Sequence, residues 1–208
     1  MNRVSISYAI TACNEHIELK RLLDQLLSYI EDNDEIVVQL DTTATDEVIS
    51  TVKEYFDRVT FTQYSLNNDF ASFKNNLKSN CSKEYIFFID ADEYLSSSLI
   101  SHLKTILTEN RPIECVHVPR VNTVTGLTKE HIEKWRWNVN KKGYINWPDY
   151  QTRIIKNQPS LKWEGKVHER ICGCQIYTYL PDSDETWALY HPKDIKRQEK
   201  QNSLYDTI

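Results

Sequence analysis

Two hydrophobic patterns alternate along the first half of the chain. Short apolar runs, rich in β-branched and aromatic residues, predict buried strands. Each run precedes a stretch in which apolar residues recur at the spacing of an amphipathic helix. Strands are expected at Val4–Thr11, Glu35–Leu40, Val59–Tyr64 and Tyr85–Ile89, and helices at Leu19–Ile30 (capped by Asn14), Thr45–Tyr55, Asp69–Ser79 and Ser96–Leu107.

This alternation predicts an α/β fold with a mostly parallel central sheet, Rossmann-like in its first half and flanked by helices. After Pro112 the pattern changes to shorter strands separated by polar, aromatic loops. No repeat or flexible linker divides the chain, so we expect a single domain over residues 1–208, with a Rossmann-like half at 1–111 and a smaller mixed region at 112–208. The later elements are expected at Cys115–Val118, Arg153–Ile155, Cys174–Tyr179 and Thr186–Tyr190 (strands) and Ile195–Tyr205 (helix).

The strand expected at Tyr85–Ile89 ends in a group of acidic residues, Asp90, Asp92 and Glu93. Ligands bind at the carboxyl edge of open α/β sheets, and residues two apart on a strand point the same way. Two carboxylates held together need a cation or a proton between them, and a hard divalent ion bridging to phosphates meets that need. The alternative is that both aspartates begin a loop and cap the helix near Ser96.

Composition and charge exclude several classes of protein. Only four glycines occur in 208 residues, and neither a glycine-rich dinucleotide motif nor a P-loop is present. No apolar run approaches membrane-spanning length, and Met1–Ser5 lacks a signal peptide's apolar core. The odd number of cysteines, five, favours reduced thiols, so we expect a cytoplasmic protein without a transmembrane segment.

The net charge of −5 is unevenly distributed. Residues Lys129–Arg170 hold ten Lys or Arg and five Asp or Glu, a formal charge of +5, together with four tryptophans. A basic, aromatic segment suits an anionic or stacking partner, and a solvated face over an aromatic core is the alternative.

Several segments, in order along the chain, together resemble family-2 glycosyltransferases. An apolar strand leads into an N-E turn, a D-x-x-x-T-D turn follows the second strand, and D-F-A begins a helix. A D-x-D follows the fourth strand, a W-x-G-x-V-H-E segment resembles one bacterial branch, and a histidine precedes a basic terminal helix. These segments are Ile6–Glu15, Asp41–Asp46, Asp69–Asn75, Phe88–Glu93, Trp163–Glu169 and His191–Tyr205. Thr42 and Thr43 replace the family's Asp-Gly and Lys74 its Arg, changes that concern the nucleotide more than the reaction.

The resemblance implies a GT-A fold and transfer of a hexosyl or pentosyl group from a nucleotide-sugar, most simply a UDP-sugar, with inversion. Residues 1–111 would then bind the nucleotide-sugar and residues 112–208 the acceptor. The nucleotide-sugar residues would be Thr11, Ala12, Asn14, Glu15, Asp41, Asp69, Lys74, Asp90 and Ala91.

The resemblance also implies a metal site and a catalytic base. Asp92 would ligate Mn²⁺ or Mg²⁺, with Asp90 and His191 as further candidates. Glu169 would take the proton of the acceptor hydroxyl, His168 would share that role or orient the diphosphate, and Asp149 is the reserve base. The residues that would contact the acceptor are Trp147, Asp149 and Trp163.

Each of these residues also has a structural interpretation. Asp41 can cap a helix, Asp69 and Lys74 can form a surface pair, and tryptophans more often pack in cores. A zinc site from His168, Cys172, Cys174 and His191 is a further alternative, although its spacing fits structural zinc sites poorly.

The acceptor stays open at this level. A saccharide, a protein, or a hydroxymethylated base in phage-type DNA would each suit the basic, aromatic second half. Two other functions compete: a non-catalytic module that binds nucleotide-sugar or nucleic acid, and a nucleotidyltransferase, whose usual glycine-rich start differs from Thr11–Glu15.

Overall fold

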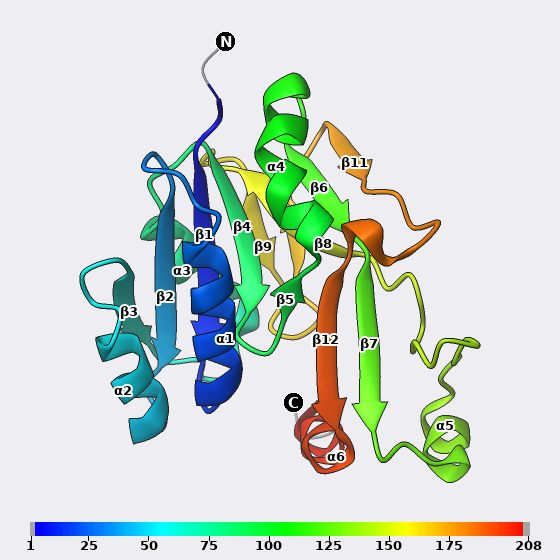
Figure 1. Ribbon diagram of the computed structural model, residues 1–208. Helices are drawn as coiled ribbons and strands as arrows, with labels where there is room; N and C mark the ends of the chain where they lie inside the picture. The colour runs from blue at the N-terminus through cyan, green and yellow to red at the C-terminus, as the bar shows by residue number, and fades with distance from the viewer. Residues whose placement is uncertain (1–2, 206–208) are drawn as a thin grey trace.

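A seven-stranded sheet forms the centre of the protein in a computed structural model that describes residues 3–205 (Figure 1). Its strand order is β11-β6-β8-β4-β1-β2-β3. The first four strands along the chain are parallel, β8 runs antiparallel to β4 and β6, and β11 is parallel to β6. Their bounds are β1 Ile6–Ala12, β2 Glu35–Asp41, β3 Thr60–Tyr64, β4 Tyr85–Asp90, β6 Cys115–Val118, β8 Gln151–Lys156 and β11 Tyr177–Tyr179.

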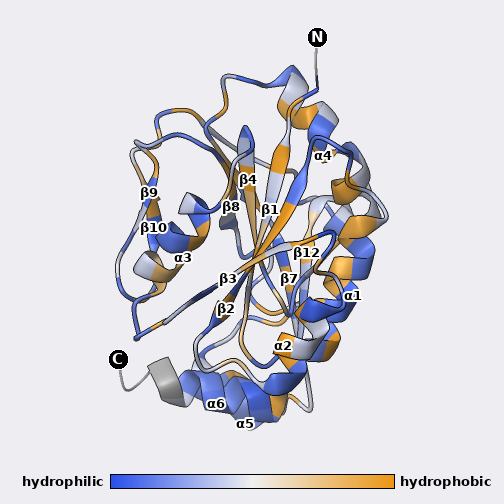
Figure 2. Cartoon of the chain, turned by 90° about the vertical axis from the view of Figure 1, so that its left-hand side faces the viewer, coloured by the Kyte–Doolittle hydropathy of each residue, from blue (hydrophilic) through white to orange (hydrophobic). Residues whose placement is uncertain are grey.

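Both faces of the sheet are covered, as Figure 2 shows with the sheet seen edge-on. Helices α1 (His16–Leu27), α2 (Asp46–Lys53) and α4 (Ser97–Glu109) pack on one face. Helix α3 (Phe70–Ser79) and the β9–β10 hairpin (Lys162–Glu164 with Arg170–Cys172) pack on the other. Burial on both faces explains why these strands read as continuous apolar runs.

A second, three-stranded sheet stands beside the first. In it β12 (Leu189–Asp194) runs parallel to β7 (Arg120–Thr125) and antiparallel to the short β5 (Tyr94–Leu95). Beyond the carboxyl ends of β7 and β12 lie α5 (Lys129–Trp135) and α6 (Ile195–Tyr205) (Figure 1). The remaining element is a 3₁₀ turn at Glu185–Trp187.

The predicted α/β fold with a mostly parallel sheet is confirmed. Three local predictions are wrong. Asn14 does not cap α1, because Glu15 occupies the N-cap position and makes no side-chain cap bond. Asp90 and Asp92 do not cap α4, because Ser96 accepts the Leu99 N–H. The last strand begins after, not at, the Glu185–Trp187 turn.

Five strands and helices were not predicted: β5, β7, α5, β9 and β10. Among the described residues, no helix combines the length and the apolar character that crossing a membrane requires.

Candidate active site

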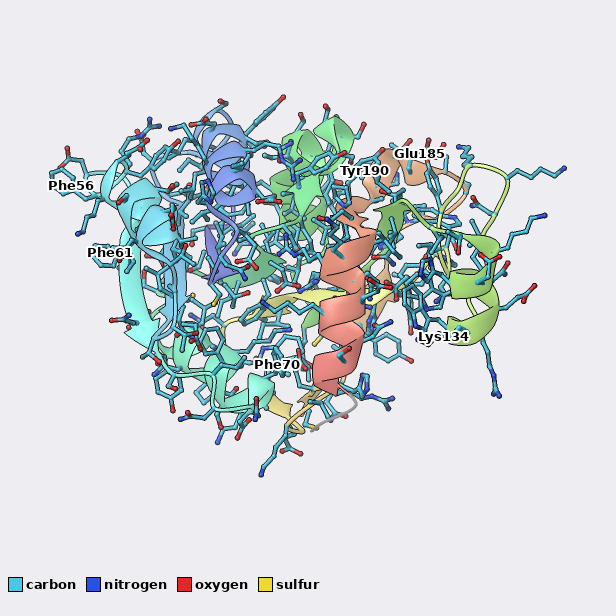
Figure 3. All side chains as sticks on the ribbon, turned by 90° about the horizontal axis from the view of Figure 1, so that it is seen from below. Phe56, Phe61, Phe70, Lys134, Glu185 and Tyr190 are labelled. Atoms are coloured by element: carbon cyan, nitrogen blue, oxygen red, sulfur yellow. The ribbon has the colours of Figure 1, made fainter. Side chains whose placement is uncertain are left out.

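A cleft of about 980 Å³ opens at the carboxyl ends of β1, β2 and β4. The second sheet forms its other wall, with Asn122 of β7 and His191 of β12 facing into it. Figure 3 looks along the strands from below and shows α6 across this region, with Phe70 of α3 on one side and Lys134 of α5 on the other. The site therefore lies at the sheet edge at which open α/β folds bind ligands.

Most of the residues predicted for the site line this cleft. They come from the ends of three strands, from α3, from the loop before β8, from the β9–β10 hairpin and from β12. The lining includes Thr11, Ala12, Asn14, Glu15, Asp41, Lys74, Asp90, Ala91, Asp92, Asp149, His168, Glu169 and His191.

Asp92 and His191 form a nearly buried pair in the cleft. His191 Nε2 lies 3.1 Å from Asp92 Oδ2, and His191 Nδ1 lies 2.9 Å from Oδ1 of Asn122. Burial alone raises the pKa of Asp92, but the hydrogen bond and charge of His191 outweigh it and lower that pKa to about 2. Asp92 is thus a carboxylate at neutral pH. It contacts Nε2 of His191, whose other ring nitrogen, Nδ1, is held by the side-chain amide of Asn122.

This pair fits a divalent cation. With Nδ1–H donated to Asn122, the nitrogen that faces Asp92 is the one that would ligate a cation bound between the two side chains. A carboxylate oxygen and one imidazole nitrogen leave the remaining positions to phosphate oxygens and water, the coordination usual for Mg²⁺ or Mn²⁺ with nucleotides. Within residues 3–205 no cluster of three or more His, Cys, Asp or Glu is arranged to hold a metal unaided, so the zinc set of His168, Cys172, Cys174 and His191 is not assembled.

Arg197 of α6 neutralises Asp92 in this arrangement. Its Nη2 lies 3.2 Å from Asp92 Oδ2 and 2.7 Å from Oε1 of Glu15. The second oxygen of Glu15 accepts the backbone N–H groups of Cys13 and Asn14. Glu15 therefore connects the turn after β1 with the terminal helix.

Asp90 is engaged in a different way from Asp92. Its Oδ2 lies 2.7 Å from Arg153 Nη2, and its Oδ1 accepts the Thr11 hydroxyl at 3.0 Å. Burial raises the pKa of Asp90, but Arg153 and then Lys74 hold it well below its usual value. Asp90 is thus occupied by Arg153, which leaves Asp92 and His191 as the two predicted ligands in contact.

Glu93 and two arginines form a buried network of ion pairs next to Asp90. Glu93 is fully buried, and its Oε1 lies 2.5 Å from Arg153 Nη2 and 3.2 Å from Arg120 Nη1. Its Oε2 accepts the Asp90 backbone N–H at 3.1 Å. Arg120 in turn donates through Nε and Nη2 to Asp149 Oδ2. This network ties the end of β4 to β7 and β8.

Asp41 ends β2 at the other side of the cleft. Its Oδ1 accepts the Thr43 N–H at 2.7 Å, and its Oδ2 accepts the Leu66 N–H at 2.7 Å. Burial raises the pKa of Asp41, but the Thr43 hydroxyl, which also donates to Oδ1, and these two N–H groups lower it overall, so the group is a carboxylate. The helix-capping alternative is wrong, because Thr45 occupies the N-cap position of α2.

Glu169 and Lys74 meet across the cleft from different elements. Lys74 Nζ lies 2.5 Å from Glu169 Oε1, and both side chains are largely buried. The same ammonium sits 4.5 Å from the ring centre of Trp163. His168, next to Glu169, lines the cleft in the left-handed backbone region at φ 54°.

Three predicted residues lie outside the cleft lining. Asp69 caps α3 by accepting the Ser72 N–H at 2.9 Å. Trp147 lines a separate, shallower pocket of about 320 Å³ beside Tyr144 and Glu185. Trp163 is 5% exposed and packs edge-to-face on Phe88, as a core residue does. The positions of Trp147 and Trp163 do not support the acceptor contacts expected of them.

Sequence reasoning missed Arg120, Asn122, Arg153 and Lys193, all of which line the cleft. Glu93 was noted only as part of the acidic group. Its position directly after Asp90 and Asp92 hid its buried, structural role, because a carboxylate there looks like part of the ligand site.

Residues 7–179 match the family model described as Glycosyl transferase family 2. A curated relative, the SPbeta prophage-derived glycosyltransferase SunS of Bacillus subtilis (strain 168), is 28% identical over 167 residues. The match covers 79% of this chain and 34% of SunS, so the chain spans about a third of that relative's length.

Solved structures of S. aureus TarS, residues 1–349, share the fold. The complex with UDP gives a TM-score of 0.62 at 12% identity, covering 90% of this chain and 60% of TarS. The complex with UDP-GlcNAc gives a TM-score of 0.54 at 12% identity, covering 89% of this chain and 60% of TarS. At this identity the likeness shows the fold alone, and it confirms the expected GT-A architecture.

Proposed function

The chain belongs to glycosyl transferase family 2, and from that premise we propose that it is a metal-dependent, inverting glycosyltransferase that uses a UDP-sugar. The observation that supports this best is the Asp92–His191 pair at the carboxyl edge of the sheet, next to Asp41 and the turn after β1. That TarS binds UDP and UDP-GlcNAc supports uracil as the base of the donor nucleotide.

We assign the donor mainly to residues 1–111 and the acceptor mainly to residues 112–208. Thr11, Asp41 and Lys74 line the cleft from the first part, while Asn122 and Asp149 line it from the second. Asp92 and His191, one from each part, would hold Mn²⁺ or Mg²⁺. When bound, the ion supplies positive charge that offsets the charge growing on the departing diphosphate.

Transfer is a single displacement at the anomeric carbon. A bond forms from the acceptor hydroxyl oxygen to that carbon as its bond to the diphosphate oxygen breaks, and the hydroxyl proton passes to a carboxylate. Glu169 suits that role, because its second oxygen is left available by the Lys74 pair. Asp149 suits it less well, since Arg120, Asn122 and Gln151 already donate to its two oxygens.

Glu169→Gln should lower kcat for sugar transfer by about 10²–10⁴-fold and leave the Kd for UDP within about twofold, because it removes the proton acceptor and keeps an amide oxygen for Lys74. Initial rates with a UDP-sugar and calorimetric binding of UDP measure the two quantities. Glu164→Gln, an exposed carboxylate on the same hairpin, is the matched control. If Glu169→Gln keeps a wild-type kcat, Glu169 is not the catalytic base and Asp149 takes its place as the candidate.

Asp41→Asn should weaken UDP binding by about 10–100-fold, because a carboxylate that accepts the uracil imide N–H is replaced by a neutral amide. Isothermal calorimetry with UDP and Mn²⁺ gives the Kd, and Asp57→Asn removes the same charge from an exposed position far from the cleft lining. If Asp41→Asn binds UDP as tightly as wild type and has a normal melting temperature, the uracil binds elsewhere in the cleft.

A further inference from the structure

Aromatic side chains line the cleft from two sides. Phe70 and Phe73 come from α3, beside Lys74. Trp137, two residues beyond the end of α5, comes from the side of β7. Figure 3 shows Phe70 and the α5 segment on opposite sides of α6. The phenylalanines thus belong to the side assigned to the donor, and Trp137 to the side assigned to the acceptor.

The Trp137 indole packs against the ring of Trp135. Its ring centre lies 4.6 Å from that of Trp135, which stacks on His131 at 5.0 Å with an interplanar angle of 16°. His131 Nε2 reaches Glu199 of α6 at 3.4 Å. A large ring held by packing loses little conformational freedom when a ligand stacks on it.

The backbone at Trp137 is fixed as well. Its N–H donates to the Ile132 carbonyl at 3.0 Å, and Arg136 before it takes the left-handed conformation at φ 55° that ends α5. The chain then forms a short hairpin in which Val139 pairs with Ile145. Trp137 is therefore presented by an ordered turn.

Strand pairing places Trp137 away from the reacting centre. His191 pairs with Asn122, Asn122 with Ile145, and Ile145 with Val139. Three steps of about 5 Å put Val139 up to about 15 Å from His191. A group bound at Trp137, near Val139, lies beyond the acceptor hydroxyl that attacks the donor.

The cleft surface next to Trp137 is neutral. It consists of Thr123, Val124, Ile145 and Asn146, which offer a hydroxyl, an amide and apolar contacts. Lys134 and Arg136 are exposed and do not line the cleft. Lys193 of β12 pairs with Val124 and also lines the cleft, and its charge acts on Asp92. The basic residues of α6 act on the same side, because Arg197 contacts Asp92 and Lys200 acts on Cys13. An aromatic face flanked by neutral hydrogen-bonding groups suits the face and hydroxyls of a sugar better than a phosphate.

We propose that Trp137 is a specificity-determining residue that stacks on a neutral sugar ring of a saccharide acceptor, beyond the unit that carries the attacked hydroxyl. The proposal rests on the glycosyltransferase function above, and it replaces Trp147 and Trp163 as the aromatic contact to the acceptor.

The test compares wild type with Trp137→Ala, Trp137→Phe and Trp147→Ala. Radiolabelled UDP-glucose, UDP-galactose and UDP-GlcNAc are supplied with Mn²⁺, and the acceptors are the disaccharides cellobiose, lactose, maltose and N,N′-diacetylchitobiose. Peptides rich in Ser, Thr and Cys and hydroxymethylated DNA serve as the competing acceptor classes. Hydrolysis of each donor without acceptor is measured in parallel, because it reports the donor site alone.

We expect Trp137→Ala to raise the KM for the best disaccharide by about tenfold or more, with donor hydrolysis within about twofold of wild type. Trp137→Phe should recover part of the loss, and Trp147→Ala should match wild type. An unchanged disaccharide KM in Trp137→Ala overturns the proposal, and so does transfer to peptide or DNA with none to any saccharide. If wild type neither hydrolyses nor transfers any donor, the proposed function fails first and this inference with it.

Discussion

Asp92→Asn is expected to lower kcat/KM for sugar transfer by about 10³-fold. The replacement keeps the size of the side chain and an oxygen for His191, but it removes the negative charge that a divalent cation needs. Since the pKa of Asp92 is about 2, the native group carries that charge throughout the working pH range. Initial rates at saturating Mn²⁺ and varied UDP-sugar measure the effect.

Two controls separate this role from a structural one. Asp182→Asn removes the same charge from an exposed loop and should match wild type. The Mn²⁺ concentration that gives half-maximal rate should rise in Asp92→Asn, while the melting temperature without ligand stays within a few degrees. Activity within twofold of wild type, at the same Mn²⁺ requirement, would contradict a metal role for Asp92.

Arg153→Met should destabilise the fold by about 3–5 kcal/mol, because it leaves the fully buried Glu93 without its closest cation. For a chain of 208 residues this corresponds to a fall in Tm of about 6–20 °C. Calorimetric melting measures it, with the exposed Arg170→Met as control. The double variant Arg153→Met, Glu93→Gln should regain part of the loss, because the fully buried position 93 then carries no unpaired charge. A Tm within 2 °C of wild type for Arg153→Met would contradict the network.

The pH dependence of stability follows from the other ion pair of Arg153, the one with Asp90. Since the pKa of Asp90 is lowered in the folded protein, the pair stabilises fully above the unfolded value near pH 4 and is lost as pH falls through the folded pKa. In Arg153→Met the cation is gone and burial raises that pKa, so the loss should begin at higher pH.

The first half of the fold was predictable because its information is local. Tyr85–Ile89 is apolar at every position, and the structure buries each of these side chains. The carboxyl end of such a strand lies at the ligand edge of the sheet, which places Asp90 and Asp92 without knowledge of any partner.

The partners of these acids were not predictable in the same way. Arg120 and Arg153 reach Glu93 from strands 27 and 60 residues further along the chain, and nothing near Glu93 specifies them. β7 and α5 lie in a polar, aromatic stretch that shows neither strand nor helix period clearly. Trp163 could have been placed better, since Lys162 and Glu164 on either side of it alternate with it as a half-buried strand does.

Thermal unfolding with UDP, with and without Mn²⁺, tests most directly whether the cleft binds a nucleoside diphosphate through a cation. At a UDP concentration of about 100 times Kd, binding adds about 2.7 kcal/mol to the free energy of unfolding, which raises Tm by about 5–10 °C. We predict that rise with UDP and Mn²⁺ together, little with either alone, and none with both in Asp92→Asn. If neither UDP nor any UDP-sugar shifts the wild-type Tm in the presence of Mn²⁺, or if Asp92→Asn shows the full shift, the account is contradicted.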